Sequence, residues 1–191
     1  MQDAISQVWH DPRKLCQDSA PSRTPPSSAL SPFPPGLNVR ASEIEVLGEP
    51  GLAPYFSLAG LLCPSDTLIY SSVDRKEVFA IARNQGRSQE LEVDRQGRIL
   101  TGSVPAHSDF VWSIQGANGE TGVVQDLETL ISHAPEARIA CDLSVSGARV
   151  PLPSRWDTAI FDAKSWQGPQ GVSLLLIHET ARWRHPFPPF N

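Results

Sequence analysis

The sequence predicts a single α+β domain whose sheet is mainly antiparallel, a meander followed by a hairpin, with two or three helices. Four short segments between residues 67 and 104 are rich in β-branched and aromatic residues, and only three or four turn residues separate one from the next. Connections of that length leave no room for a crossover, so neighbouring segments are expected to pair antiparallel. Apolar residues recur at helical spacing elsewhere in the chain, which adds the helices.

A proline- and serine-rich arm precedes this domain. Between residues 18 and 38 the apolar residues follow neither the period of two of a strand nor the period of 3.6 of a helix. Burial of apolar surface therefore cannot offset the conformational entropy lost on ordering, and the segment is expected to be disordered. Before it, in a short predicted helix at residues 3–10, Ile5, Val8 and Trp9 form one apolar stripe. The stripe is predicted to bind a partner's groove, or else to fold back onto its own domain.

The predicted domain spans residues 42–185, between the arm at 1–41 and a proline- and phenylalanine-rich tail at 186–191. Apolar and acidic residues alternate at 43–46, which predicts a half-buried strand. Residues 53–64 are apolar nearly all round, with a proline suited to a first helical turn, and predict a core helix.

The sheet of the predicted domain follows this helix. Its meander consists of four segments, at residues 67–73, 77–83, 88–93 and 98–104. The largely apolar segment "FVWSI" at 110–114 predicts a buried strand, and apolar residues at helical spacing predict a helix at 123–137.

A second hairpin is predicted at residues 139–152, with residues 146–147 as a two-residue turn. Alternate residues of its two strands then face the same side of the sheet, and no ligand is required to explain the pattern. The next segment, 153–166, keeps helical spacing, and the apolar run at 172–177 predicts a strand buried on both faces.

The charge and the cysteine content of the sequence argue against several classes of binding partner. A net charge of -5 and an isoelectric point near 5.5 argue against nucleic acid and anionic membranes as partners. The cysteines Cys16, Cys63 and Cys141 lie far apart, so neither a disulfide framework nor a metal site is predicted, which favours the cytoplasm. No apolar run reaches the length of a membrane span and no secretory leader is recognised.

No catalytic signature is present. The sequence has no Gly-x-Ser-x-Gly motif, and its cysteines outside the arm lie in apolar segments typical of packing. His107 and His178 stand near carboxylates at strand edges, but adjacent strand residues point to opposite faces. The sequence therefore predicts no catalytic residue, no metal and no cofactor, and it does not predict an enzyme.

One spacing points to a ligand. Asp142, Ser144 and Gly147 form an Asp-x-Ser-x-x-Gly box in "DLSVSG", and Arg83 and Arg87 form an upstream Arg-x-x-x-Arg. The box resembles the second motif of PilZ domains, which bind cyclic di-GMP, and the arginine pair is similar to that family's phosphate- and guanine-binding motif. The resemblance implies that these five residues bind a cyclic dinucleotide, whereas the hairpin explains the box without a ligand.

The function predicted from these observations is a non-catalytic cytoplasmic protein-interaction protein, either an adaptor or an immunity-like binding protein, whose partner is another protein. The strand rhythm of residues 66–100, followed by "SDFVWSI", is similar to the SUKH-type immunity superfamily, α+β domains that bind and neutralise toxins. A PilZ-like cyclic-dinucleotide-binding module is the main alternative, and an uncharacterised hydrolase is the third.

Overall fold

The computed structural model describes residues 37, 39–102, 107–166 and 168–187. A seven-stranded sheet with the order β1-β7-β6-β5-β4-β2-β3 forms its centre. The strands are β1 (Ile44–Leu47), β2 (Thr67–Ser71), β3 (Ser88–Leu91), β4 (Phe110–Gln115), β5 (Arg138–Asp142), β6 (Thr158–Asp162) and β7 (Ser173–Ile177). The α-helices are α3 (Ala53–Leu61), α4 (Lys76–Gln85) and α5 (Leu127–Ser132), and short 3-10 turns are η2 (Ala41–Glu43), η3 (Pro50–Leu52), η4 (Gly147–Arg149) and η5 (Ala163–Trp166).

The sheet is mixed and mostly parallel. Strands β3, β2, β4, β5 and β6 run in one direction, while β7 is antiparallel to both of its neighbours, β6 and β1. The predicted mainly antiparallel sheet is therefore wrong. Helix α4 connects β2 to β3 and helix α5 connects β4 to β5, so strand and helix alternate in these parts of the chain.

The predicted meander fails at its second segment. Residues 77–83 lie within helix α4, where Val78 and Ala82, four residues apart, are its buried positions. Gly86 follows the helix with a φ of 77°, the left-handed conformation that commonly ends helices. The apolar residues of this segment satisfy a helical period as well as an alternating one, and α4 carries the chain across so that β3 pairs with β2 in parallel.

The predicted second hairpin and the helix after it are also wrong. Strand β5 pairs in parallel with β4 and β6, and the expected turn at Gly147 begins the 3-10 turn η4 instead. The segment predicted as a helix at 153–166 contains strand β6, in which Ala159, Ile160 and Phe161 are consecutive and all buried. A strand buried on both faces loses the alternation that distinguishes it from a helix.

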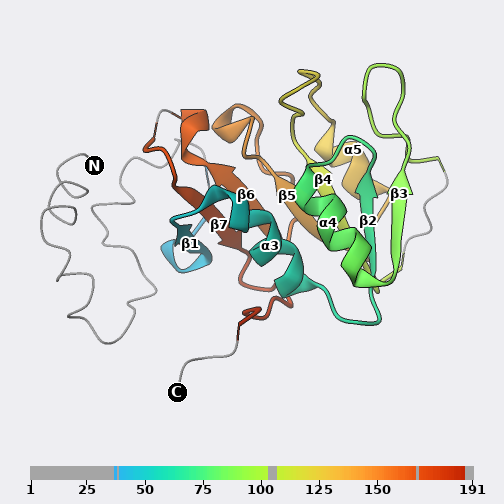
Figure 1. Ribbon diagram of the computed structural model, residues 1–191, viewed down its shortest axis with the longest axis horizontal. Helices are drawn as coiled ribbons and strands as arrows, with labels where there is room; N and C mark the ends of the chain where they lie inside the picture. Colours follow the sequence, from blue (N-terminus) through green and yellow to red (C-terminus); the bar gives the residue numbers. More distant parts are fainter. Residues whose placement is uncertain (1–36, 38, 103–106, 167, 188–191) are drawn as a thin grey trace, which may run out of the picture.

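Helices cover both faces of the sheet (Figure 1). On one face, α3 and α4 pack on β2, β4 and β5 through a cluster that includes Leu58, Leu61, Val78 and Val111. On the other face, α5 packs through Leu127, Leu130 and Ile131 onto a larger cluster of strand residues. The sheet is thus the middle of three layers.

Other predicted elements are confirmed. Strand β1, helix α3, strand β4 and strand β7 lie where the sequence predicts them. The predicted arm helix with Ile5, Val8 and Trp9 lies outside the described residues. Within the described ranges, no helix has the length and apolarity that crossing a membrane requires.

Candidate functional site

The strand order reverses between β2 and β4, and we call the space between the loops that follow these two strands the crevice. After β2 the chain passes to β3 on one side, and the next strand, β4, lies on the other side of β2. Such a reversal separates the loops at the carboxyl ends of two parallel strands, which is where open α/β sheets bind ligands. The loops that follow β2, β4, β5 and β6 all meet this carboxyl edge of the sheet, so it is the first place to look for a site.

Asp142 ends strand β5 at this edge, and its side chain is largely buried. One carboxylate oxygen accepts hydrogen bonds from the backbone N–H of Ser144, at 2.9 Å, and from the Ser144 hydroxyl. The other oxygen lies 3.4 Å from Nη1 of Arg75. Both oxygens therefore have partners, and the carboxylate is held in one orientation.

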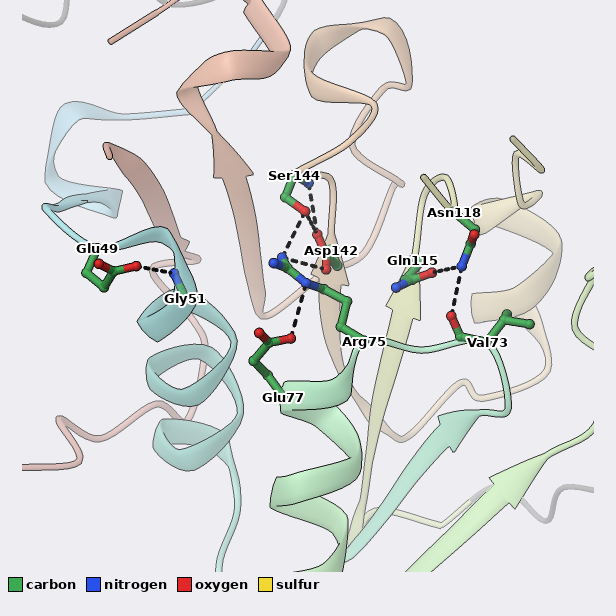
Figure 2. Close-up of polar contacts among 9 residues, drawn as sticks. All are labelled: Glu49, Gly51, Val73, Arg75, Glu77, Gln115, Asn118, Asp142 and Ser144. Carbon is green, nitrogen blue, oxygen red and sulfur yellow. Dashed lines mark hydrogen bonds and ion pairs between the residues drawn. The ribbon is translucent and has the colours of Figure 1, made fainter. Parts of the chain in front are cut away.

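Arg75 comes from the start of helix α4, where it is the N-cap residue. Besides Asp142, its guanidinium donates to the Ser144 hydroxyl at 3.1 Å and lies 3.6 Å from the Glu77 carboxylate. Figure 2 shows the Arg75 side chain reaching from the top of α4 toward Asp142 and Ser144, with Glu77 on its other side. One cation thus bridges the beginning of α4 and the end of β5.

Asp74 adds a second buried acid beside this pair. One of its oxygens accepts from the backbone N–H of Ser71 at 2.9 Å, and the other, Oδ1, is buried without a hydrogen-bond partner in the described part of the protein. Burial, and then the negative charge of Asp142, raise the pKa of Asp74 to about 7, although the Ser71 hydrogen bond opposes this. Its carboxyl group can therefore gain or lose a proton near neutral pH.

Asn118 joins the two sides of the crevice. Its amide nitrogen donates to the backbone carbonyl of Val73, after β2, at 2.9 Å and to Oε1 of Gln115, at the end of β4, at 3.3 Å (Figure 2). Its amide oxygen accepts from the backbone N–H groups of Glu120 and Thr121. Asn118 therefore fixes the distance between the loops that border the reversal of strand order.

Lys164 lies at the same edge. It follows β6 by two residues within η5, and its backbone N–H donates to the Asp162 carboxylate at 3.0 Å. Since β6 lies next to β5, with Asp142 paired to Ile160, this exposed lysine stands on the turn beside the Asp142 strand end. The carboxylate of Asp142 thus ends one strand, and the primary amine of Lys164 belongs to the turn that follows the neighbouring strand.

The structure brings only part of the predicted ligand set together. Asp142 and Ser144 are hydrogen-bonded to each other. Arg83 lies in the last turn of α4, and Arg87, beyond it, donates to the backbone carbonyl of Ser65 at the opposite edge of the sheet. Within the described ranges, no hydrogen bond or ion pair joins either arginine to Asp142.

Gly147, the remaining residue of the predicted box, begins η4 with a φ of 54° and packs closely on Ser165. It therefore shapes the loop between β5 and β6.

Sequence reasoning missed Arg75, Asn118 and Lys164. Arg75 and Lys164 were hidden because the elements around them were misassigned, one as a meander and the other as a helix. A strand followed by the start of a helix would have marked Arg75 as a candidate at a carboxyl edge. Asn118 lies in a glycine-rich stretch, and its position after a buried strand was the available signal.

Solved structures share this fold. A NifS-like protein matches 78% of this chain at 21% identity with a TM-score of 0.68. A cysteine desulfurase from Thermococcus onnurineus matches 74% at 16% identity with a TM-score of 0.64. An aspartate aminotransferase from Thermus thermophilus matches 74% at 17% identity with a TM-score of 0.63. No protein-family model and no curated protein matches the sequence.

The chain spans about half the length of these structures, covering 46%, 39% and 44% of the three. The matches overturn the predicted non-catalytic adaptor or immunity-like protein, because this fold carries enzymes. The likeness to SUKH-type domains depended on reading α4 as a strand, and a mostly parallel sheet does not support the PilZ-like alternative. The chain has the fold of NifS-like and aminotransferase proteins.

Proposed function

We propose that this chain is the coenzyme-binding domain of a pyridoxal-phosphate-dependent enzyme that acts on amino acids. The observation that carries the proposal is the held carboxylate of Asp142 at the carboxyl edge, beside the strand reversal, with a lysine on the adjacent turn. The amino acid substrates named for the matching structures, such as aspartate and alanine, support the substrate class.

Asp142 suits the ring nitrogen of the coenzyme. Enzymes of this type commonly pair the pyridinium nitrogen with an aspartate, which keeps that nitrogen protonated. The Ser144 N–H and hydroxyl hold one oxygen of Asp142, which leaves the second oxygen to accept from the ring nitrogen in place of Arg75. The residue type, its burial and its orientation therefore fit the group.

Lys164 suits the aldehyde. Pyridoxal phosphate acts as an electron sink that stabilises carbanions formed on an amino acid substrate, and it is held through a lysine amine. Two lysines lie in the described part of the chain, Lys76 at the start of α4 and Lys164 after β6. Lys164 is the better candidate because its turn follows the strand next to Asp142.

The first turn of α4 suits the phosphate. This helix has 10 residues and begins directly after β2, so its first N–H groups and its dipole favour an anion at the crevice. Asp142 and Lys164 on one side and the α4 start on the other then provide a partner for the ring nitrogen, the aldehyde and the phosphate. A cytoplasmic location is part of the proposal and is supported by the free thiols of Cys63 and Cys141.

Titration of the purified chain with pyridoxal phosphate tests the proposal. We expect saturable binding with a shift of the coenzyme's visible absorbance, and borohydride reduction should leave the coenzyme attached to the peptide that contains Lys164. The substitution Asp142→Asn should weaken binding, because an amide oxygen is a poorer partner for a protonated ring nitrogen than a carboxylate.

Lys76→Ala is the matched control for Lys164→Ala. Both variants lose one lysine at the same edge of the sheet, but only Lys164→Ala should abolish the borohydride-stable attachment. No saturable binding at about 1 mM coenzyme, the weak end of specific affinities, would refute the proposal. Attachment that follows Lys76 instead of Lys164 would refute the assignment of the amine.

A further inference from the structure

The guanidinium of Arg75 lies between the two places that the proposed function assigns to the coenzyme. Its backbone belongs to the start of α4, where the phosphate would bind, and its Nη1 lies 3.4 Å from Asp142, where the ring nitrogen would bind. Figure 2 shows the side chain spanning the gap between these points. A pyridine ring that reaches Asp142 from the α4 start must therefore take the place of the Arg75 guanidinium.

Several carboxyl groups surround the guanidinium of Arg75. Asp142 and Glu77 both lie within ion-pair distance of it, and Asp74 precedes it in the chain. A phosphate at this helix start would face Glu77 and Asp74, so the favourable helix dipole is opposed by two acidic side chains. A guanidinium beside the phosphate offsets that repulsion, since arginine binds phosphate through paired, charge-assisted hydrogen bonds.

We infer that Arg75 makes the site prefer pyridoxal phosphate over pyridoxal, because its guanidinium exchanges the carboxylate of Asp142 for the phosphate of the coenzyme. This inference rests on the proposed function. In the structure Arg75 is the counter-ion of Asp142; with the coenzyme bound, the ring nitrogen replaces it there and the guanidinium pairs with the phosphate at the α4 start. Only when a phosphate is present do both Asp142 and the displaced guanidinium gain a new partner. Pyridoxal, which lacks the phosphate, breaks the Arg75–Asp142 pair and leaves the guanidinium without a new anion.

The measurement is the ratio of two dissociation constants, that of pyridoxal over that of pyridoxal phosphate, for the wild type and for Arg75→Gln. We expect the ratio to fall at least roughly tenfold in the variant, the value of one hydrogen bond to a charged group. The ratio falls because pyridoxal phosphate loses its counter-ion. In the variant neither compound has to separate Asp142 from Arg75, so that contribution is the same for both and cancels in the ratio. Direct binding, followed by absorbance or calorimetry, gives both constants without any assay of turnover.

Lys76→Gln is the matched control, because it removes one positive charge from the next residue of the same helix start. It should leave the ratio within about twofold of the wild type, whereas a general charge effect would lower the ratio in both variants. Arg75→Lys keeps the charge without the paired donors of a guanidinium and should give an intermediate ratio. Thermal unfolding confirms that each variant is folded, and Arg75→Lys carries the test if Arg75→Gln is not.

The outcomes separate the two proposals. If the wild type binds pyridoxal phosphate and Arg75→Gln keeps the wild-type ratio, the inference about Arg75 is wrong while the proposed function stands. If the wild type binds neither compound, the proposed function fails and the inference fails with it. A lower ratio in Arg75→Gln alone supports both.

Discussion

The Asp142 carboxylate acts on Asp74 across the carboxyl edge of the sheet. Burial is the larger cause and the charge of Asp142 the smaller one, and together they raise the pKa of Asp74 from 3.8 to about 7. Asp74 lies in the loop after β2 and Asp142 at the end of β5, and of these two acids Asp142 is the one that pairs with Arg75. The edge therefore holds an acid whose ionisation opposes folding near neutral pH.

The first prediction concerns pH and Asp74→Asn. Well below pH 3.8 the carboxyl group of Asp74 is protonated in both the folded and the unfolded state and costs nothing. As the pH rises from there toward 7, the unfolded chain releases this proton more readily, so the free energy of unfolding falls. An asparagine cannot ionise and should remove that decline, raising stability above pH 7 by an amount on the order of a few kcal/mol. Urea denaturation across this pH range measures it.

The control for this prediction is Asp109→Asn, at an exposed aspartate. It should leave the pH dependence of the unfolding free energy as it is in the wild type. If Asp74→Asn and the wild type lose stability in parallel between about pH 4 and pH 8, Asp74 does not carry the raised pKa.

The second prediction concerns the ion pair of Arg138 with Asp66. Arg138 Nη2 lies 2.8 Å from the Asp66 carboxylate, and their side chains are only 15% and 7% exposed. Arg138→Met leaves a buried carboxylate without its partner and should cost about 3 kcal/mol of unfolding free energy. Adding Asp66→Asn should recover a large part of that loss, because the amide oxygen can still accept from the backbone N–H of Cys63. Equal losses in the single and double variants would show that unpaired charge is not the cause.

The third prediction concerns Gly60 and Trp183. A Cβ added at Gly60 would overlap the indole ring of Trp183, whose Nε1 donates to the backbone carbonyl of Phe56 at 3.0 Å. Gly60→Ala should displace the indole, shift its fluorescence toward that of an exposed tryptophan and lower stability by about 1–3 kcal/mol. Gly48→Ala, where a Cβ meets no atom within 4 Å, should change neither. Unchanged fluorescence in Gly60→Ala would mean that the chain after β7 does not pack as described.

The fourth prediction separates the two roles of Asn118. Asn118→Asp keeps an oxygen that accepts from the N–H groups of Glu120 and Thr121, but it loses the donor to the Val73 carbonyl. Asn118→Asp should therefore cost about 1–3 kcal/mol of stability, from the lost hydrogen bond and from repulsion between oxygens. Thermal unfolding measures the change.

Coenzyme binding gives a second readout for Asn118. If this residue holds the two loops of the crevice together, Asn118→Asp should also weaken binding of pyridoxal phosphate. Thr121→Val, which removes one hydroxyl that donates to the same amide oxygen, should have little effect on either quantity. A stable Asn118→Asp variant with wild-type affinity would contradict the bridging role.

The sequence predicted correctly those elements whose apolar residues fit only one type of secondary structure. Residues 110–114 and 172–177 are apolar apart from one serine each and too short for helices, and both are strands. Helix α4 could not be distinguished in this way, because Val78, Ala80 and Ala82 satisfy an alternating pattern and Val78 with Ala82 also a helical one. Once this helix was taken for a strand, the short connections on either side of it required antiparallel pairing. The whole sheet was therefore predicted to be mainly antiparallel.

The candidate site was predicted in part, and for a different reason. Asp142 and Ser144 stand out in the sequence because of their spacing, and in the structure they are hydrogen-bonded to each other. Their partner Arg75 lies 67 residues earlier in the chain and reaches them only because β2 and β5 both flank β4. A contact of that kind depends on strand order, which no local pattern in this chain reveals.

The pairing of β1 with β7 also orders the events of folding. Ile44 is partnered by Leu176, so the first described strand completes the sheet beside the last one. Contacts between such distant parts of a chain form late, because a long loop must close before they contribute. During synthesis from the N-terminus, β1 is therefore made early, but it has no strand to pair with until β7 has been synthesised. Until β1 pairs with it, the apolar strand β7 has no neighbour on one side, so β1 is the strand that completes the sheet.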